Sequence, residues 1–103
     1  MPATAHPYRF RRLPTAEVAS HRVPVAVTLL SRLLGLAFMR PERAGQGLLI
    51  PRCRSVHTFG MRFALDLDFL DECGALISRR ADVPANRIVS ERDADAVLET
   101  PAD

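Results

Sequence analysis

The sequence predicts one α+β domain that is mainly β and carries one short amphipathic helix. At 103 residues the chain is long enough for a single hydrophobic core. Apolar residues alternate with other residues from Phe63 to Leu70, which is the spacing of a strand with one buried face. Between Leu29 and Ala37 the leucines recur at the spacing of one apolar helix face. These observations favour a strand-rich fold with a single core.

The other elements follow from turn residues that separate the apolar runs. We expect a loose N-terminal arm over residues 1–19 and a single domain over 20–103. Within that domain the expected elements are a strand over 22–27, a helix from its cap Thr28 to a point before Pro41, and strands over 47–50, 63–70, 75–83 and 94–99. Residues 71–74 have the composition of a tight turn, so 63–83 should form a β-hairpin.

Charge is divided unevenly along the chain. All fourteen basic residues are arginines, a usage that together with abundant Ala, Leu and Val is typical of a high-GC bacterial gene. Residues 1–62 hold ten arginines and two acids, whereas residues 63–103 hold four arginines and ten acids. We expect the two halves to pair with each other in the fold; the alternative is a basic face for an anionic partner.

The cysteines and apolar runs indicate a cytoplasmic protein. Cys53 and Cys73 make no disulfide framework, so we expect reduced thiols. Arginines at 9–12 followed by an apolar stretch resemble a secretion signal, but Pro14 and Glu17 interrupt the region and no small-residue cleavage site follows. The apolar run over 23–30 is too short to span a membrane, so we expect no membrane association.

The segment over residues 51–66 is where we expect a functional surface. It lies between two predicted strands and gathers a thiol, an imidazole, arginines, a thioether and a carboxylate. Irregular segments on a rigid scaffold often carry binding sites. If the segment is extended, His57, Phe59 and Met61 share one face, and a core-facing trio is favoured over a ligand pocket. The candidate surface residues are Cys53, His57, Phe59, Met61, Arg62 and Asp66.

Three other functions stay open at this point. Cys53 and His57 could hold a metal ion, but no second ligand pair is recognisable and we expect neither a metal nor a cofactor. A thiol-dependent enzyme would need Cys53, His57 and Asp66 to converge, so we name no catalytic residue. Arginine runs could follow phosphates, yet the chain has one Tyr and no Trp to stack on bases, which argues against nucleic-acid binding.

Two aspartates on the strand over 63–70 point to the same side. Asp66 and Asp68 are two residues apart, so their carboxylates mimic a two-acid site. We interpret Asp68 as one polar position of a half-solvated strand. Asp66 stands at the start of the strand, where its carboxylate can accept backbone hydrogen bonds and brace the preceding loop.

An ordered set of short motifs resembles a known family. The motifs are Arg32-Leu-Leu-Gly-Leu36, Gly47-Leu-Leu-Ile50, Cys53, Val56-His-Thr-Phe-Gly-Met-Arg62, Leu65-Asp66, Phe69-Leu-Asp71, Gly74 and Val97-Leu-Glu99. Together they are similar to the domain of unknown function family 192 over about residues 20–100. The resemblance implies a compact domain with a strongly bent antiparallel sheet or partial barrel and a short helix, and it implies no activity.

Departures from that family pattern predict an exposed sheet edge. Relatives commonly have Pro at the place of Ala64 and an apolar residue at the place of Asp68. Many continue past the Leu-Glu motif into a last strand, whereas this chain ends at Asp103. A missing strand would leave an edge that could form a homodimer. Our leading hypothesis is a non-catalytic binding or accessory domain that uses the 51–66 segment to contact an unidentified ligand or protein.

Overall fold

The computed structural model describes residues 13–18, 21–40 and 45–102. Its elements are β1 (Thr15–Val18), β2 (His21–Pro24), α1 (Leu29–Leu34), β3 (Leu48–Pro51), β4 (Ser55–His57), β5 (Leu65–Leu70), β6 (Leu76–Val83), β7 (Ile88–Ser90) and β8 (Ala96–Pro101). The domain is mainly β, and its sheets do not close into a barrel. The strong bend that the resemblance implies stays a prediction.

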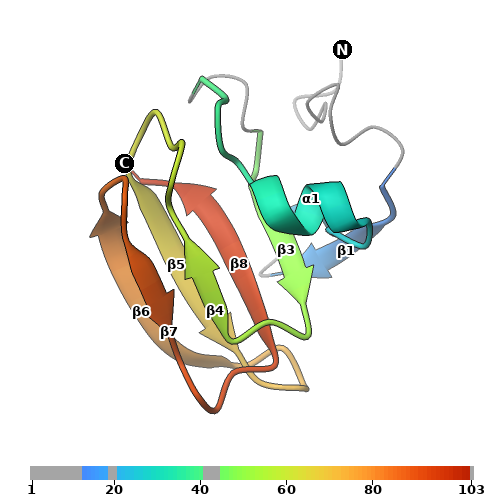
Figure 1. The fold of residues 1–103 in the computed structure, drawn as a ribbon. Coiled ribbons are helices and arrows are strands. Elements are labelled where there is room, and N and C mark those ends of the chain that lie inside the picture. The colour runs from blue at the N-terminus through green and yellow to red at the C-terminus, as the bar shows by residue number, and fades with distance from the viewer. Residues whose placement is uncertain (1–12, 19–20, 41–44, 103) are drawn as a thin grey trace.

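A four-stranded sheet in the order β3-β8-β5-β6 forms the body of the domain. All its pairings are antiparallel, and β8 lies in the middle, where Val97 stands opposite Ile50 on one side and Phe69 on the other. The predicted hairpin over 63–83 is confirmed by the pairing of β5 with β6. In Figure 1, α1 and β1 lie at the β3 side of the sheet and β6 forms the opposite edge.

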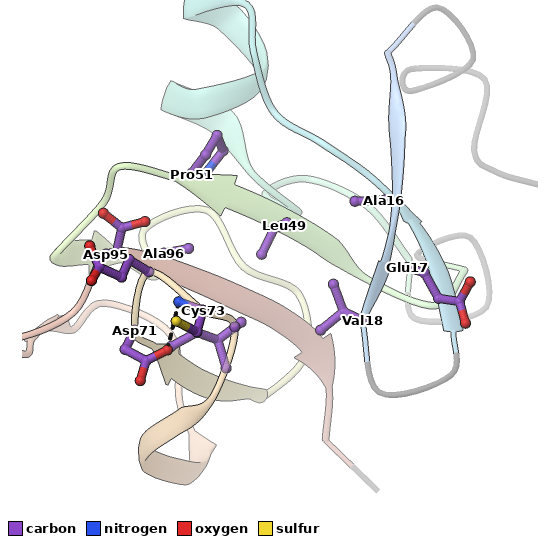
Figure 2. A pocket seen from close by; sticks show the side chains of 12 residues that line it. Ala16, Glu17, Val18, Leu49, Pro51, Asp71, Cys73, Asp95 and Ala96 are labelled. Atoms are coloured by element: carbon purple, nitrogen blue, oxygen red, sulfur yellow. Dashed lines mark hydrogen bonds between the residues drawn. The ribbon is translucent and has the colours of Figure 1, made fainter.

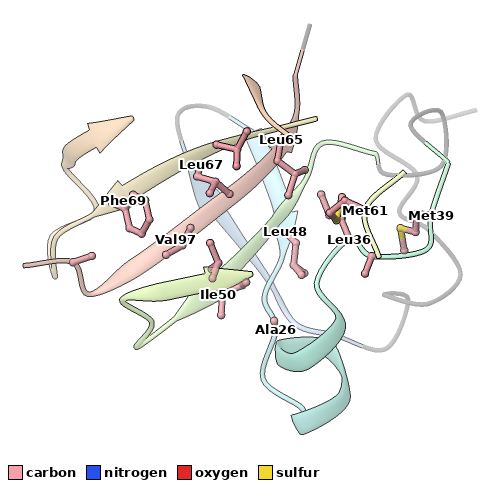
Figure 3. Close-up of a cluster of buried hydrophobic side chains, with 14 residues drawn as sticks. Ala26, Leu36, Met39, Leu48, Ile50, Met61, Leu65, Leu67, Phe69 and Val97 are labelled. Atoms are coloured by element: carbon pink, nitrogen blue, oxygen red, sulfur yellow. The ribbon is translucent and has the colours of Figure 1, made fainter. Parts of the chain in front are cut away.

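The main core covers one face of this sheet. Leu65, Leu67 and Phe69 of β5 are fully buried, which confirms the alternation expected from the sequence. Figure 3 shows these side chains in one cluster with Val97 and Ile50, while residues from the segment after α1 gather at the cluster's far end. On the opposite face, Val23, Leu70 and Leu98 form a second, smaller cluster. The central strands are therefore covered on both sides.

A short helix begins at its expected cap, Thr28, but the amphipathic helix face predicted from the leucine spacing over residues 29–37 is not supported. Thr28 accepts a hydrogen bond from the Ser31 N–H at the start of α1, but the helix has only six residues and ends at Leu34, well before Pro41. Gly35 follows with a φ of 54°, and Phe38 also has a positive φ, of 65°. An α-helix cannot continue through such backbone angles, so the leucine spacing overestimated its length.

Three short strands, β1, β4 and β7, were not predicted. β1 pairs with β2, which overlaps the strand expected over 22–27, and β4 pairs with β7, each as a two-stranded antiparallel ribbon. β1 lies within the predicted arm, most of which falls outside the described residues, so the domain boundary at residue 20 stays a prediction. None of the described helices has the length and apolar character needed to span a bilayer.

Candidate functional site

Thr58 fixes the middle of the 51–66 segment to the loop between β6 and β7. Its N–H donates to the Arg87 carbonyl at 2.8 Å, and its hydroxyl donates to the Pro84 carbonyl at 2.7 Å. The N–H groups of Asn86 and Arg87 donate back to Thr58 oxygens. Thr58 is fully buried, and no feature of the sequence marked it as the anchor. The turn after β4 is therefore held in one conformation before any ligand binds.

The Cys53 side chain is a half-buried thiol rather than an activated nucleophile. Its Sγ donates to the Ser55 carbonyl at 3.2 Å, and the residue packs against the main core. Burial raises the pKa of this thiol, although a hydrogen bond from the Ser55 backbone to the thiolate and the charge of the Arg32 guanidinium both act to lower it. The flanking arginines therefore do not produce the low-pKa thiol that the enzyme alternative requires.

His57 and Asp66 have hydrogen-bond partners of their own. Nδ1 of His57 accepts from the Phe59 N–H at 3.2 Å, and the two rings stack with centroids 5.4 Å apart. Asp66 accepts from the Asp82 N–H at 3.0 Å, so it braces β6 rather than the loop before β5. The described residues include no group of three or more His, Cys, Asp or Glu placed to hold a metal ion. Neither the thiol-enzyme nor the metal alternative is favoured.

The candidate residues divide between core and surface. Met61 is buried in the main core, where Figure 3 shows it beside Leu36 and Met39. Phe59 is 48% exposed and Arg62 is exposed. The expected core-facing trio is therefore wrong, because the Gly60 backbone has a φ of 77° and the chain turns between Phe59 and Met61.

Phe38, Phe59 and Ile88 form an exposed surface that we call the apolar face. Phe38 is 65% exposed and Ile88 is 69% exposed. The Phe38 N–H donates to the Gly60 carbonyl at 2.8 Å, and the Phe38 ring lies so close to Gly60 that a Cβ there would be 2.7 Å from it. Ile88 stands directly opposite His57 in the β4–β7 ribbon, and the imidazole stacks on Phe59. Facing residues in an antiparallel pair lie on the same side, so Ile88 is linked to Phe59 through His57, and Phe38 is linked to Phe59 through Gly60.

Glu99 is a buried carboxyl that the sequence reasoning missed. It is 3% exposed, and its Oε1 has no hydrogen-bond partner within the described part of the chain. The Leu36 N–H donates to the carboxylate, and a Cβ at Gly35 would lie 2.7 Å from Oε1. Burial raises the pKa of Glu99 to about 7, although the Leu36 contact opposes the shift. Acidic residues on strands are usually solvated, so no local signal distinguished this one.

A cleft of about 390 Å³ lies on another side of the domain, between β1 and the turn after β5 (Figure 2). Apolar side chains such as Leu49 and Val18 line it, and Glu17, Asp71 and Asp95 also border it. Asp71 accepts hydrogen bonds from the Cys73 and Ala75 N–H groups, so it shapes the turn. Arg79 and Asp68, both from the acidic half, form an ion pair, and the expected pairing between the two halves of the chain stays a prediction.

The two cysteines should differ in reactivity. Cys73 is exposed beside the cleft, whereas Cys53 is half-buried with a raised pKa. At pH 7.5 we expect Cys73 to react at least about tenfold faster than Cys53 with a thiol-disulfide reagent, because the thiolate is the reacting form. Absorbance at 412 nm with dithiobis-nitrobenzoate measures both phases. Cys73→Ser should remove the fast phase, and a fast phase that persists in this variant would contradict the assignment.

Two solved structures have folds similar to that of this chain. The chain is similar to the crystal structure of a "putative transcription regulator" from Sinorhizobium meliloti 1021, with a TM-score of 0.68 and 23% identity over 85% of this chain and 78% of that chain. It is also similar to a protein of unknown function from Novosphingobium aromaticivorans DSM 12444, with a TM-score of 0.67 and 18% identity over 99% of this chain and 86% of that chain. At these identities both likenesses show a shared fold.

No curated protein matches the chain. The model of the family described as uncharacterised ACR, domain of unknown function family 192, matches residues 12–103 and confirms the resemblance seen in the motifs. The protein therefore belongs to the domain of unknown function family 192.

Proposed function

We propose that this protein is a non-catalytic binding domain whose contact surface is the apolar face. The observation that supports the proposal is the exposure of Phe38, Phe59 and Ile88 in one connected surface on a small domain. Clustered exposed apolar side chains, especially aromatic ones, are typical of surfaces that bind other molecules. The 51–66 segment supplies Phe59 to this surface, so the proposal keeps that segment as part of the contact surface.

The backbone of the apolar face supports the same function. Phe38 has a φ of 65°, which is a rare conformation for a bulky side chain. Its N–H bond to the Gly60 carbonyl holds this conformation and leaves the ring 65% exposed. Residues held in rare backbone conformations cluster at functional sites. The strain is thus accounted for if the ring contacts a ligand.

The alternatives have less support. The Cys53 thiol has a raised pKa, and both His57 and Asp66 have separate partners, which weakens the enzyme hypothesis. Arg32 donates to the carbonyls of Pro51 and Arg52 at 2.6 and 3.2 Å, so it serves the fold rather than a phosphate. The homodimer through a sheet edge stays a prediction.

An apolar dye tests the proposal directly. Titration with Nile red, which is neutral, should raise its fluorescence and shift the amide resonances of Phe59, Gly60 and Ile88. Phe59→Ser should weaken binding at least about tenfold, as expected for loss of an aromatic contact. Leu76→Ser is the matched control, because Leu76 is 58% exposed on β6. Equal loss in both variants, or no shift at residues 59–60, would overturn the proposal.

A further inference from the structure

Three exposed arginines lie within two residues of the chain segments that form the apolar face. Arg40 follows Phe38 by two residues, and Arg62 follows Gly60 by two residues. Arg87 precedes Ile88, and its main chain is hydrogen bonded to Thr58. Its guanidinium Nη1 also donates to the Ala85 and Asn86 carbonyls, at 3.3 and 3.4 Å, which holds that group at the loop between β6 and β7. Each of the three chain segments that build the face therefore contributes one cation.

These cations have no carboxylate partner within the described ranges. None of Arg40, Arg62 and Arg87 forms an ion pair there. The three segments that carry them, residues 36–40, 57–63 and 84–90, contain no Asp or Glu. An apolar centre with an unpaired positive border attracts a ligand that is apolar in its middle and negative at its edges, and it repels one with positive edges.

We infer that the apolar face binds a peptide segment in which apolar side chains are flanked by carboxylates. The inference rests on the proposed function and adds to it the chemical class of the partner. A peptide fits better than a single-stranded nucleic acid for two reasons. Ile88, the most exposed residue of the face, is aliphatic, and one face of the Phe59 ring already contacts the His57 imidazole. Base stacking needs free aromatic faces, whereas apolar side chains can contact all three residues.

Three labelled decapeptides test the inference by fluorescence anisotropy. They share the same Leu and Phe residues and differ only in flanking Glu, Gln or Lys. At 50 mM salt we expect the Glu peptide to bind at least about fivefold more tightly than the Gln peptide, as three exposed ion pairs would give. The Lys peptide should bind most weakly, and the preference for Glu should decline as the salt concentration rises.

Variants identify which cations are responsible. The triple variant Arg40→Gln, Arg62→Gln, Arg87→Gln should bind the Glu and Gln peptides equally, while still binding Nile red. Arg80→Gln, which changes an exposed arginine on β6, is the control and should keep the preference for Glu. These side chains are on the surface, and circular dichroism will check that each variant keeps its fold.

The outcomes separate the inference from the proposed function. If the unmodified protein bound the Glu and Gln peptides equally well, the inference would be overturned. The proposed function would still hold if that protein bound Nile red at the apolar face. Failure of all three peptides and of Nile red would overturn both. Tighter binding of a labelled fifteen-nucleotide oligothymidylate or of anionic phosphatidylglycerol vesicles, lost in the triple variant, would assign the surface to another class of partner and overturn the peptide inference.

Discussion

Glu99→Gln should make the protein more stable at pH 8 and remove most of the pH dependence of its stability. Glu99 is 3% exposed, and burial raises its pKa from 4.5 to about 7. A shift of this size corresponds to about 3 kcal/mol between the two protonation states. Glutamine resembles the protonated acid in shape and charge, and its oxygen can still accept the Leu36 N–H.

The direction of the effect follows from which state holds the proton. Because the folded pKa of Glu99 is above the unfolded value, the folded protein binds this proton more tightly than the unfolded chain does. The resulting stability is fully present below pH 4.5 and is lost as the pH rises through about 7. The Cys53 thiol interacts electrostatically with the Glu99 carboxyl and with the Arg32 guanidinium.

Urea unfolding at pH 5 and pH 8 measures the effect. The unmodified protein should lose up to about 3 kcal/mol of stability between these values from this group, and Glu99→Gln should lose much less. Glu17→Gln, which changes an exposed carboxylate on β1, is the control and should behave like the unmodified protein. Parallel pH profiles for Glu99→Gln and the unmodified protein would show that the folded protein does not retain the Glu99 proton.

Gly47→Ala should destabilise the protein by at least about 3 kcal/mol. Gly47 has a φ of 108°, and a Cβ there would overlap the main-chain carbonyl oxygen of Glu99 and lie 2.8 Å from Cγ2 of Thr100. Backbone atoms in the middle of the sheet cannot move aside as a side chain can. The loss combines the cost of the positive φ with that of forcing β3 away from β8.

Gly74→Ala separates these two contributions. Gly74 has a φ of 82°, but a Cβ there would have no atom within 4 Å. Replacing Gly74 by alanine should therefore lower the free energy of unfolding by only about 1 kcal/mol, the ordinary penalty for an alanine in a left-handed backbone conformation. Thermal unfolding of both variants gives the comparison. Similar losses in the two would mean that the approach of Gly47 to β8 is not tight.

The elements of the main sheet could be predicted because their signal is local. The alternation in β5 and the turn composition of residues 71–74 identify a hairpin from neighbouring residues alone. The strands β4 and β7 were missed because each has three residues, and they are stable only through their pairing with each other and the Thr58 hydrogen bonds. A strand of this length has too few residues to show a period.

The candidate site could be located from the sequence but not built from it. The 51–66 segment does carry Phe59 and Arg62 on the surface. Phe38 and Ile88, which complete the apolar face, come from segments about twenty to thirty residues away and were not selected. Their positions depend on the Phe38 bond to Gly60 and on the register of His57 with Ile88. Such contacts between distant segments leave no spacing pattern in the chain.

The sequence by itself determined the family, the mainly β class and the buried face of β5, because motif order and alternation are properties of neighbouring residues. Only the tertiary structure decided that the Cys53 thiol is half-buried, that Met61 belongs to the core and that Glu99 is buried. The physical reason is that burial depends on segments remote in the chain. Glu99, for example, lies on β8, a central strand that is covered on both faces, so strands and turns from other parts of the sequence enclose its carboxyl.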